Sequence, residues 1–349
     1  MTGRDVMAYD DIFVKSNDLA HLDGPTVISL AHNEMYFLPA WLDHYRKLGA
    51  ERFIILDDAS TDGTLDYLRA QSDVMVVGSR RRYGDQVAVH DPTAASDVQR
   101  RMGHLWKMIL PERYCRDDWL ILADLDEFLV LPPDRPMRAI FDELEHAAFD
   151  AICGTMLDVY PRDIADLRHR KGDDSLDLAA DWFFDAEPHH PAGTTGEIDP
   201  VYHGARARLV HRFITLPQEA LALRLLDPLR AWRRTRRGQS RYGRANKITK
   251  YPLLRWRPGG WMPSAHRVAL PASPDHHLPI LHMKFTGDLY RRARQALRDK
   301  SYHNGSAEYV QMVELLAAME RSNASFLYPN SAPVGDHEAF RRSRLLVGF

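Results

Sequence analysis

The sequence predicts an α/β protein in which a mostly parallel sheet is flanked by helices. Three short apolar runs, at 26–31, 53–56 and 74–77, have the length and the β-branched or large apolar residues of buried strands. Helical periodicity separates them, and alternation of strand and helix is typical of right-handed parallel units. A fourth apolar run, 119–122, leads directly into a group of carboxylates.

Length and composition indicate an ordinary globular protein. The chain has 349 residues, enough for one large domain or two joined ones. Its net charge of −2 gives no sign of a nucleic-acid partner, and two cysteines provide no disulfide framework. No apolar run approaches the roughly 18–20 residues that span a bilayer, and the first residues lack a signal-peptide core. We therefore expect a cytoplasmic protein that does not bind nucleic acid.

The first half of the chain gives the clearest pattern. The strand at 26–31 is followed by apolar residues at helical spacing from Phe37 to Leu48, and Gly49 ends that helix. After the second strand, Ser60, Thr61 or Asp62 can cap the next helix. Further helices are expected at roughly 94–110, 290–299 and 308–321. We expect four segments: a leader at 1–24, a nucleotide-binding core at 25–160, acceptor-side loops with a basic segment at 161–300, and a C-terminal helix and tail at 301–349.

Polar clusters follow three of the predicted strands, at His32–Glu34, Asp57–Ser60 and Asp124–Asp126. The carboxyl ends of parallel strands meet at one edge of a sheet, where such folds bind ligands. Helix capping and turn formation are the alternative explanation for Asn33 and Ser60. No glycine-rich loop follows the first strand, which disfavours a dinucleotide-binding dehydrogenase.

The Asp124-x-Asp126 motif predicts a metal site. In extended backbone the two carboxylates project to the same side, with Glu127 beside them. Hard oxygen ligands suit Mg²⁺ or Mn²⁺ shared with a substrate diphosphate, whose departing charge the ion would neutralise. The alternative is that these acidic residues simply end a strand and begin a turn.

Taken together, the segments Val27–Glu34, Ile54–Thr64 and Ala123–Phe128 resemble the family 2 type glycosyltransferases with a GT-A fold. The likeness is strongest to the branch in which the metal motif has the sequence Asp-Leu-Asp-Glu-Phe. It covers roughly 25–160, and a weaker likeness continues at Leu281–Phe285, similar to a Leu-His-x-Lys-Phe element late in that branch.

The resemblance implies an inverting transfer of a sugar from a nucleotide donor to an acceptor hydroxyl. Asp58 would recognise the base, usually uracil, whose imide N–H can donate to a carboxylate, and this favours UDP-sugars. Asp124 and Asp126 would hold the donor's ribose and diphosphate and the metal ion. Further residues expected to line the donor site are Ala31, Asn33, Glu34, Asp57 and Ser60.

Two late histidines are candidates to complete the metal site. GT-A enzymes often use a histidine near the end of the chain, so the resemblance favours His282, with His266 as the second choice. Lys284, two residues beyond His282, would balance the diphosphate charge. A lone histidine on an apolar run is otherwise more often a buried structural residue.

An inverting transferase also needs a base for the acceptor hydroxyl. The segment Asp181–Asp185 combines carboxylates with aromatic residues, which suits contact with a sugar but also a hydrophobic plug under a loop. We assign the catalytic role to Asp185 and Asp181, although the sequence does not rank them above Glu187 and Asp199.

Two basic segments remain. Arg80–Arg82 would bind phosphate or form a solvated loop. Arg224–Arg257 has twelve basic residues against Asp227 alone, which suits a lipid-linked or acidic glycan acceptor, or contact with the inner face of a membrane. Its leucine-rich beginning is consistent with an interfacial helix, and a solvated surface segment is the alternative.

Two other functions stay open. A metal-dependent nucleotidyl or phosphoryl transferase would use the same carboxylates, but its usual phosphate loop rich in Gly and Lys is missing from the sequence. A non-catalytic module that binds a glycan or a membrane would act through Arg224–Arg257. The sugar, the acceptor and the oligomeric state are not specified by the sequence.

Overall fold

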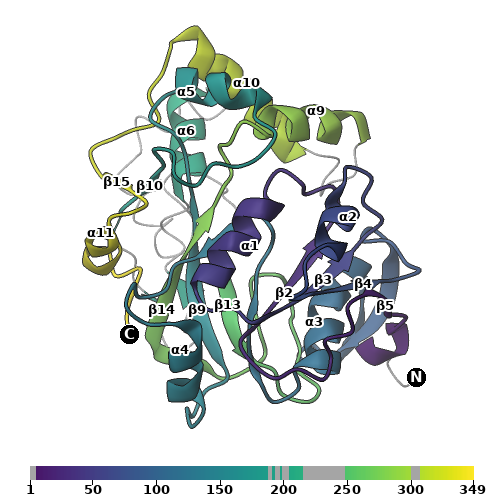
Figure 1. Ribbon diagram of the computed structural model, residues 1–349. Coiled ribbons are helices and arrows are strands. Elements are labelled where there is room, and N and C mark those ends of the chain that lie inside the picture. Colours follow the sequence, from purple (N-terminus) through teal and green to yellow (C-terminus); the bar gives the residue numbers. More distant parts are fainter. Residues whose placement is uncertain (1–4, 188–190, 193–196, 199–203, 215–247, 300–306) are drawn as a thin grey trace. The chain divides into compact units, whose positions relative to one another are not determined.

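The computed structural model describes residues 5–187, 191–192, 197–198, 204–214, 248–299 and 307–349. Among these, nine strands form one sheet in the order β1-β4-β3-β2-β7-β13-β9-β14-β8, and the α/β class is confirmed (Figure 1). The strands of this sheet are β1 (Phe13–Ser16), β2 (Thr26–Ala31), β3 (Arg52–Asp57), β4 (Val74–Gly78), β7 (Trp119–Leu122), β8 (Glu127–Leu129), β9 (Ala151–Asp158), β13 (Thr249–Arg255) and β14 (Ala272–His282).

The described helices and the remaining short strands lie outside this sheet. The helices are α1 (Leu38–Lys47), α2 (Thr64–Arg69), α3 (Met102–Tyr114), α4 (Met137–Leu144), α5 (Ile164–His169), α6 (Gly204–Phe213), α9 (Leu289–Asp299), α10 (Ala307–Arg321) and α11 (His337–Arg342), with 3₁₀ turns at Val6–Tyr9 and Arg170–Gly172. The short strands form three pairs: β5 (Gln86–Asp91) with β6 (Ser96–Arg101), β10 (Phe183–Asp185) with β15 (Ser331–Pro333), and β11 (Pro191–Ala192) with β12 (Glu197–Ile198).

Four neighbouring strands, β4, β3, β2 and β7, run parallel. Ala31 at the end of β2 pairs with Asp57 at the end of β3, so the carboxyl ends of these strands share one edge. β1 and β13 are antiparallel to their neighbours β4 and β7. The predicted alternation of parallel strands and helices is therefore present where the sequence placed it.

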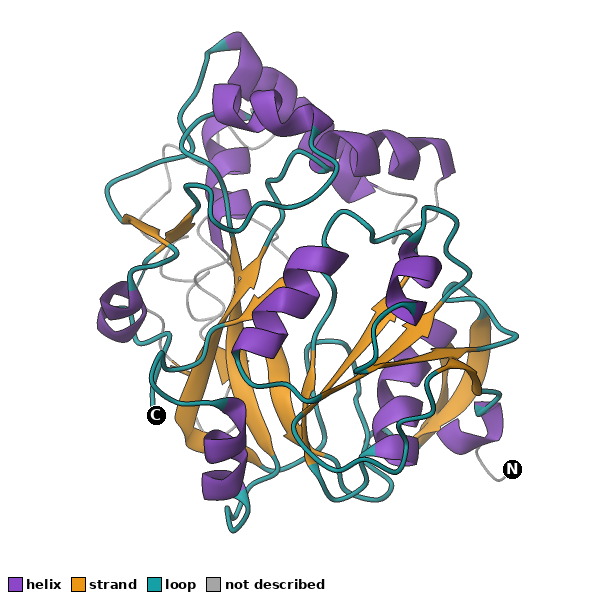
Figure 2. Ribbon diagram, viewed as in Figure 1, coloured by secondary structure: helices purple, strands orange, loops and turns teal. Residues whose placement is uncertain are grey.

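Helices cover both faces of the parallel strands (Figure 2). On β3, the Phe53 ring lies 5.8 Å from Trp41 of α1, whereas Ile54 belongs to the same core cluster as Trp106 and Ile109 of α3. Successive side chains of a strand point to opposite faces. Both faces are thus buried, which explains why these strands are continuously apolar in the sequence.

The chain divides into two compact units, and the boundary falls within β9 and β14. β13 and most of β14, from late in the chain, belong to the same unit as the N-terminal strands, and the four segments expected from the sequence stay a prediction. The first unit contains Met1–Gly154, Thr249–Ile280 and Leu346–Phe349, and the second contains Thr155–Ile248 and Leu281–Leu345.

The second unit has its own hydrophobic core. Residues from α5, α6 and α10 form one buried cluster together with Tyr160, Phe285 and Phe326. The Tyr160 and Phe326 rings are stacked with centroids 5.9 Å apart. The predicted helices near 290–299 and 308–321 are present as α9 and α10.

Two local predictions differ from the structure. The expected leader contains β1, an edge strand that pairs with β4; its sequence Phe-Val-Lys-Ser is too short and too polar to be recognised alone. The helix expected from Ala94 begins at Met102, because Ser96–Arg101 pairs along its whole length with β5.

Candidate functional site

The loops that follow β2 and β3 are joined by hydrogen bonds. The Asn33 backbone N–H donates to Ser60 Oγ (3.0 Å), and the Thr61 N–H donates to Asn33 Oδ1 (2.7 Å). The Glu34 backbone N–H donates to Thr64 Oγ1 (3.0 Å). Asn33 has a left-handed backbone with φ of 58°, a conformation that asparagine adopts more readily than most other non-glycine residues. Asn33, Glu34 and Ser60 are therefore neighbours at this edge.

The two aspartates after β3 have different surroundings. Asp57 is buried, and its carboxylate accepts from Lys15 Nζ (2.7 Å) and from the Ser60 N–H (3.2 Å). It therefore stabilises the turn itself. Asp58 accepts from the Tyr83 N–H (3.2 Å) and lies 3.3 Å from Arg82 Nε. Arg82 thus lies beside the aspartate expected to recognise the base, a role that stays a prediction.

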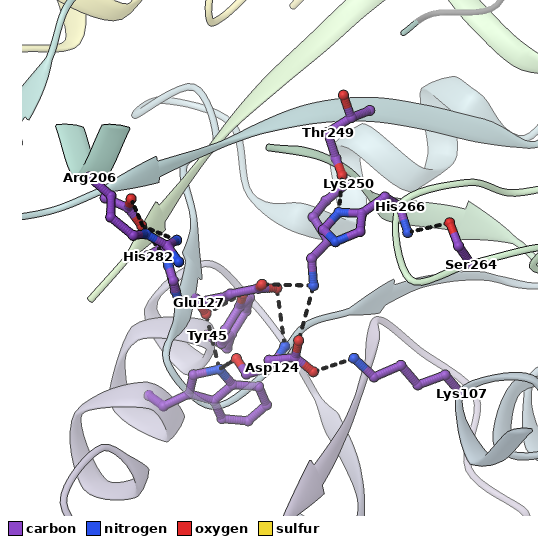
Figure 3. A network of polar contacts seen from close by, with 12 residues as sticks. Tyr45, Lys107, Asp124, Glu127, Arg206, Thr249, Lys250, Ser264, His266 and His282 are labelled. Carbon is purple, nitrogen blue, oxygen red and sulfur yellow. Dashed lines mark hydrogen bonds and ion pairs between the residues drawn. The ribbon is translucent and has the colours of Figure 1, made fainter. Parts of the chain in front are cut away.

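Asp124, at the carboxyl end of β7, is the centre of a network of charged groups (Figure 3). One carboxylate oxygen accepts from Lys107 Nζ and the other from Lys250 Nζ (3.0 Å). Lys250 also forms an ion pair with Glu127 Oε1 (2.8 Å). The other carboxylate oxygen of Glu127 accepts from the Asp124 N–H (3.3 Å). Two ammonium groups and two carboxylates thus form one continuous cluster, which we call the Asp124 cluster. The neighbouring charge of Asp126 acts on Asp124 as well and raises its pKa, opposing the effect of the lysines.

Secondary structure positions both lysines. Lys107 projects from α3, and Lys250 lies on β13, which is antiparallel to β7 with Leu253 opposite Ile121. Continuing this register by three residues places Lys250 opposite Asp124. The site therefore depends on the pairing of a strand from late in the chain with one from the N-terminal half.

The backbone beneath the Asp124 cluster is also fixed. The Trp41 Nε1–H donates to the carbonyls of Asp124 and Glu127, at 3.1 Å each. The Tyr45 hydroxyl donates to the Glu127 carbonyl (3.2 Å) and accepts from the Leu129 N–H (3.2 Å). Two buried aromatic residues of α1 thereby hold the turn between β7 and β8.

The charges within the Asp124 cluster stabilise one another. Burial alone raises the pKa of Asp124, but the ammonium groups of Lys107 and Lys250 outweigh it and hold that pKa well below its ordinary value. Burial likewise lowers the pKa of Lys250, but Asp124 and Glu127 outweigh it and raise that pKa. Asp124 and Lys250 therefore stay ionised at neutral pH.

This arrangement does not fit the divalent ion expected at Asp124 and Asp126. Both oxygens of Asp124 accept from ammonium groups, which a cation would have to displace. Within the described ranges, no three side chains of His, Cys, Asp or Glu are placed to share a metal. A Mn²⁺ or Mg²⁺ ion therefore stays a prediction of the sequence.

The two histidine candidates have polar partners of their own. His266 Nδ1 lies 2.8 Å from the Thr249 carbonyl, next in the chain to Lys250 (Figure 3). In the second unit, His282 Nδ1 lies 2.6 Å from Asp158 Oδ1, and Arg206 binds both oxygens of Asp158 at 3.1 and 3.2 Å. Burial raises the pKa of Asp158, but Arg206 and His282 outweigh it and hold that pKa well below its ordinary value.

The remaining lysine candidate lies in the second unit. Lys284 Nζ is 5.2 Å from the centre of the Tyr309 ring, a cation–π contact. Its role as a partner of the diphosphate stays a prediction.

The candidate bases are placed differently from one another. Asp185 is buried, and both of its oxygens are bound by the Arg208 guanidinium (3.0 and 2.8 Å), with the Tyr160 hydroxyl donating at 2.6 Å. This ion pair favours a structural role, and a catalytic role for Asp185 stays a prediction. Asp181 is exposed. Glu187 accepts from the Tyr328 hydroxyl (2.9 Å), and Asp199 lies outside the described residues.

Most of the basic segment Arg224–Arg257 lies outside the described residues, which resume at 248. Its described end is largely strand β13. There, Arg255 donates to Asp150 (2.7 Å) and its guanidinium lies 5.4 Å from the Trp119 ring centre. In the part of the chain that the structure covers, no helix is long and apolar enough to cross a membrane.

Sequence reasoning missed the importance of Lys107 and Lys250. Lys250 was one of twelve basic residues in a segment expected to bind an acceptor, contact a membrane or lie in solvent, and Lys107 was one cation in a predicted helix. The register of β13 against β7 singles out Lys250, and no local pattern encodes that register.

Comparisons with known proteins add little. No protein-family model and no curated protein matches the chain. Among solved structures, it is similar to UDP-glucose pyrophosphorylase complexed with UDP-glucose, with 9% sequence identity and a TM-score of 0.24. The match covers 41% of this chain and 60% of that one, less than two thirds of the pyrophosphorylase. A likeness at this level establishes neither a shared fold nor a shared activity.

Proposed function

We propose that the protein is a GT-A glycosyltransferase of the family 2 type, which transfers a sugar from a nucleotide donor to an acceptor hydroxyl. The observation that supports this most is the shared carboxyl edge of β2, β3 and β7. Asn33, Asp58 and Asp124 follow these three strands, at the edge where parallel sheets bind nucleotides.

A UDP-sugar is the donor that suits this edge best. Asp58 is a carboxylate held by the Tyr83 N–H and by Arg82, and an ionised carboxylate has acceptor sites for a further N–H. The imide N–H of uracil matches such an acceptor, whereas cytosine in its usual form offers no such donor there. We infer inversion at the anomeric carbon, with a glycan or a lipid-linked sugar as the acceptor.

A nucleotidyl or phosphoryl transferase is the second candidate. Lysine is a common ligand of phosphate, and two lysines in the Asp124 cluster would suit transfer at phosphorus as well. The two reactions differ in product. A glycosyltransferase releases the nucleoside diphosphate, whereas a nucleotidyl transferase releases or consumes pyrophosphate.

The test is calorimetric titration of the full chain with UDP, CDP and GDP. Asp58→Asn is the isosteric variant, and Asp66→Asn, on the exposed face of α2, is its matched control. We expect the wild type and the control to bind UDP at least tenfold more tightly than CDP, and Asp58→Asn to lose this preference. Failure of the wild type to bind any of the three nucleotides would refute the proposal. Release of UDP from a panel of UDP-sugars then separates glycosyl from nucleotidyl transfer.

A further inference from the structure

We propose that Lys107 and Lys250 supply the positive charge that stabilises the departing nucleoside diphosphate, in place of a divalent cation. The inference rests on the proposed function, because it concerns the same donor site. It follows from the Asp124 cluster, in which ammonium groups hold the carboxylate expected to bind the metal.

Both ammonium groups are fixed before a ligand arrives. The side chains of Lys107 and Lys250 are each 13% exposed, and they come from different elements, α3 and β13. Lys250 is held between Asp124 and Glu127, so that its position does not depend on a substrate. Charges that are oriented in advance in a partly dry site stabilise developing charge with little reorganisation.

The two ammonium groups have N–H donors that the described contacts leave unused, and the Asp124 side chain is partly exposed. An ammonium group has three N–H donors. Among the described contacts, Lys107 uses one on Asp124, and Lys250 uses two, on Asp124 and Glu127. The Asp124 side chain is 33% exposed, so this part of the cluster faces solvent. We infer that a diphosphate oxygen binds here and accepts from the lysines.

The hydrogen-bonding groups at this position suit an anion better than a cation. A divalent cation at Asp124 would have to displace two ammonium groups from its oxygens, whereas a diphosphate oxygen would accept N–H donors that those contacts leave unused.

The chemical step balances without a metal. The bond between the anomeric carbon and the diphosphate oxygen breaks, and its electron pair stays on that oxygen. The acceptor oxygen bonds to the anomeric carbon and releases its proton to a carboxylate base or to water. Lys107 and Lys250 donate hydrogen bonds to the departing diphosphate, whose negative charge grows in the transition state.

The first experiment compares UDP binding with Mn²⁺ and with a chelator, by calorimetry on the full wild-type chain. We expect the two dissociation constants to agree within twofold. Binding that is tenfold or more tighter with Mn²⁺ would overturn the inference while leaving the proposed function intact. Absence of UDP binding in both conditions would instead refute the proposed function.

The second experiment compares UDP with uridine, which lacks the diphosphate, in Lys107→Met and Lys250→Met. Lys47→Met is the matched control, because Lys47 is 74% exposed on α1 and pairs only with Asp43 among the described contacts. We expect each cluster variant to bind UDP at least tenfold more weakly and uridine within twofold of wild type. An equal loss for UDP and uridine would mean that the lysines act through the fold, and would overturn the inference. If Lys250→Met does not fold, Lys107→Met and the wild-type comparison still decide the question.

Discussion

Lys250 lies across the β7–β13 pair from Asp124, with its Nζ atom 3.0 Å from one carboxylate oxygen. The two residues are separated by 126 positions in the chain. Their contact shows that β13 contributes to the edge formed by the N-terminal strands. The candidate donor site is therefore assembled within one compact unit, from both halves of the sequence.

Replacing Lys250 by Met should destabilise the protein. The change leaves Asp124 and the buried Glu127 without a shared cation, and breaking such a pair costs about 3 kcal/mol of unfolding free energy. Urea denaturation measures this loss. Adding Glu127→Gln to this variant should recover part of the lost stability, because one unpaired charge is removed. The exposed control Lys47→Met should change the unfolding free energy by less than about 0.5 kcal/mol. An unchanged midpoint for Lys250→Met would contradict the Asp124 cluster.

The Asp185–Arg208 ion pair makes a similar but separate prediction. Asp185→Asn should lower the unfolding free energy by roughly 3–5 kcal/mol, because it leaves a buried guanidinium without its charge partner. Asp181→Asn, four positions earlier and exposed, is the matched control and should have almost no effect. A variant Asp185→Asn of full stability that cannot transfer sugar would instead support the catalytic role expected from the sequence.

Gly103 connects the start of α3 to the surroundings of Asp58. A Cβ atom at this position would overlap the Tyr83 ring, and the Tyr83 N–H donates to Asp58. We expect Gly103→Ala to displace Tyr83 and to weaken UDP binding by on the order of fivefold, or about 1 kcal/mol. Gly84→Ala is the control, since nothing lies within 4 Å of its Cβ position. Equal calorimetric affinities for both variants would show that Tyr83 does not shape the site.

His44 predicts a loss of stability in mild acid. Burial lowers its pKa from 6.5 to about 4, even though its Nε2 atom is within hydrogen-bonding distance of the Leu129 carbonyl. His44 therefore takes up a proton near pH 6.5 in the unfolded chain, but only near pH 4 in the folded chain. This contribution to stability is fully present above pH 6.5 and is lost as the pH falls towards 4.

The check is urea denaturation of His44→Gln between pH 7 and pH 5. Over this interval the variant should lose about 2 kcal/mol less stability than the wild type. His21→Gln, at an exposed position, should follow the wild-type curve. Parallel curves for His44→Gln and the wild type would contradict the burial of a neutral His44.

Local patterns predicted the parallel strands and the polar residues at their ends. β2, β3 and β7 are continuous apolar runs, and each is followed within a few residues by Asn33, Asp58 or Asp124. These features depend on short stretches of chain. They are therefore visible without knowledge of the partners across the sheet.

The features that sequence reasoning missed depend on distant pairings. Lys250 reaches Asp124 only because of the register of β13 against β7. The Asp185 carboxylate binds Arg208 of α6, 23 positions later in the chain. Neither pairing can be recognised from a repeating pattern in the sequence. The metal ion inferred from Asp124 and Asp126 stays a prediction, and the two lysines that bind Asp124 were not part of that inference.

We propose that the carboxyl edge of β2, β3 and β7 binds the nucleotide diphosphate. A crystal structure of the full chain with UDP, grown in the presence of a chelator, tests this most directly. We predict that uracil lies against Asp58 and that diphosphate oxygens lie within hydrogen-bonding distance of Lys107 and Lys250. UDP bound elsewhere, or with its diphosphate pointing away from both lysines, would contradict this placement of the donor site.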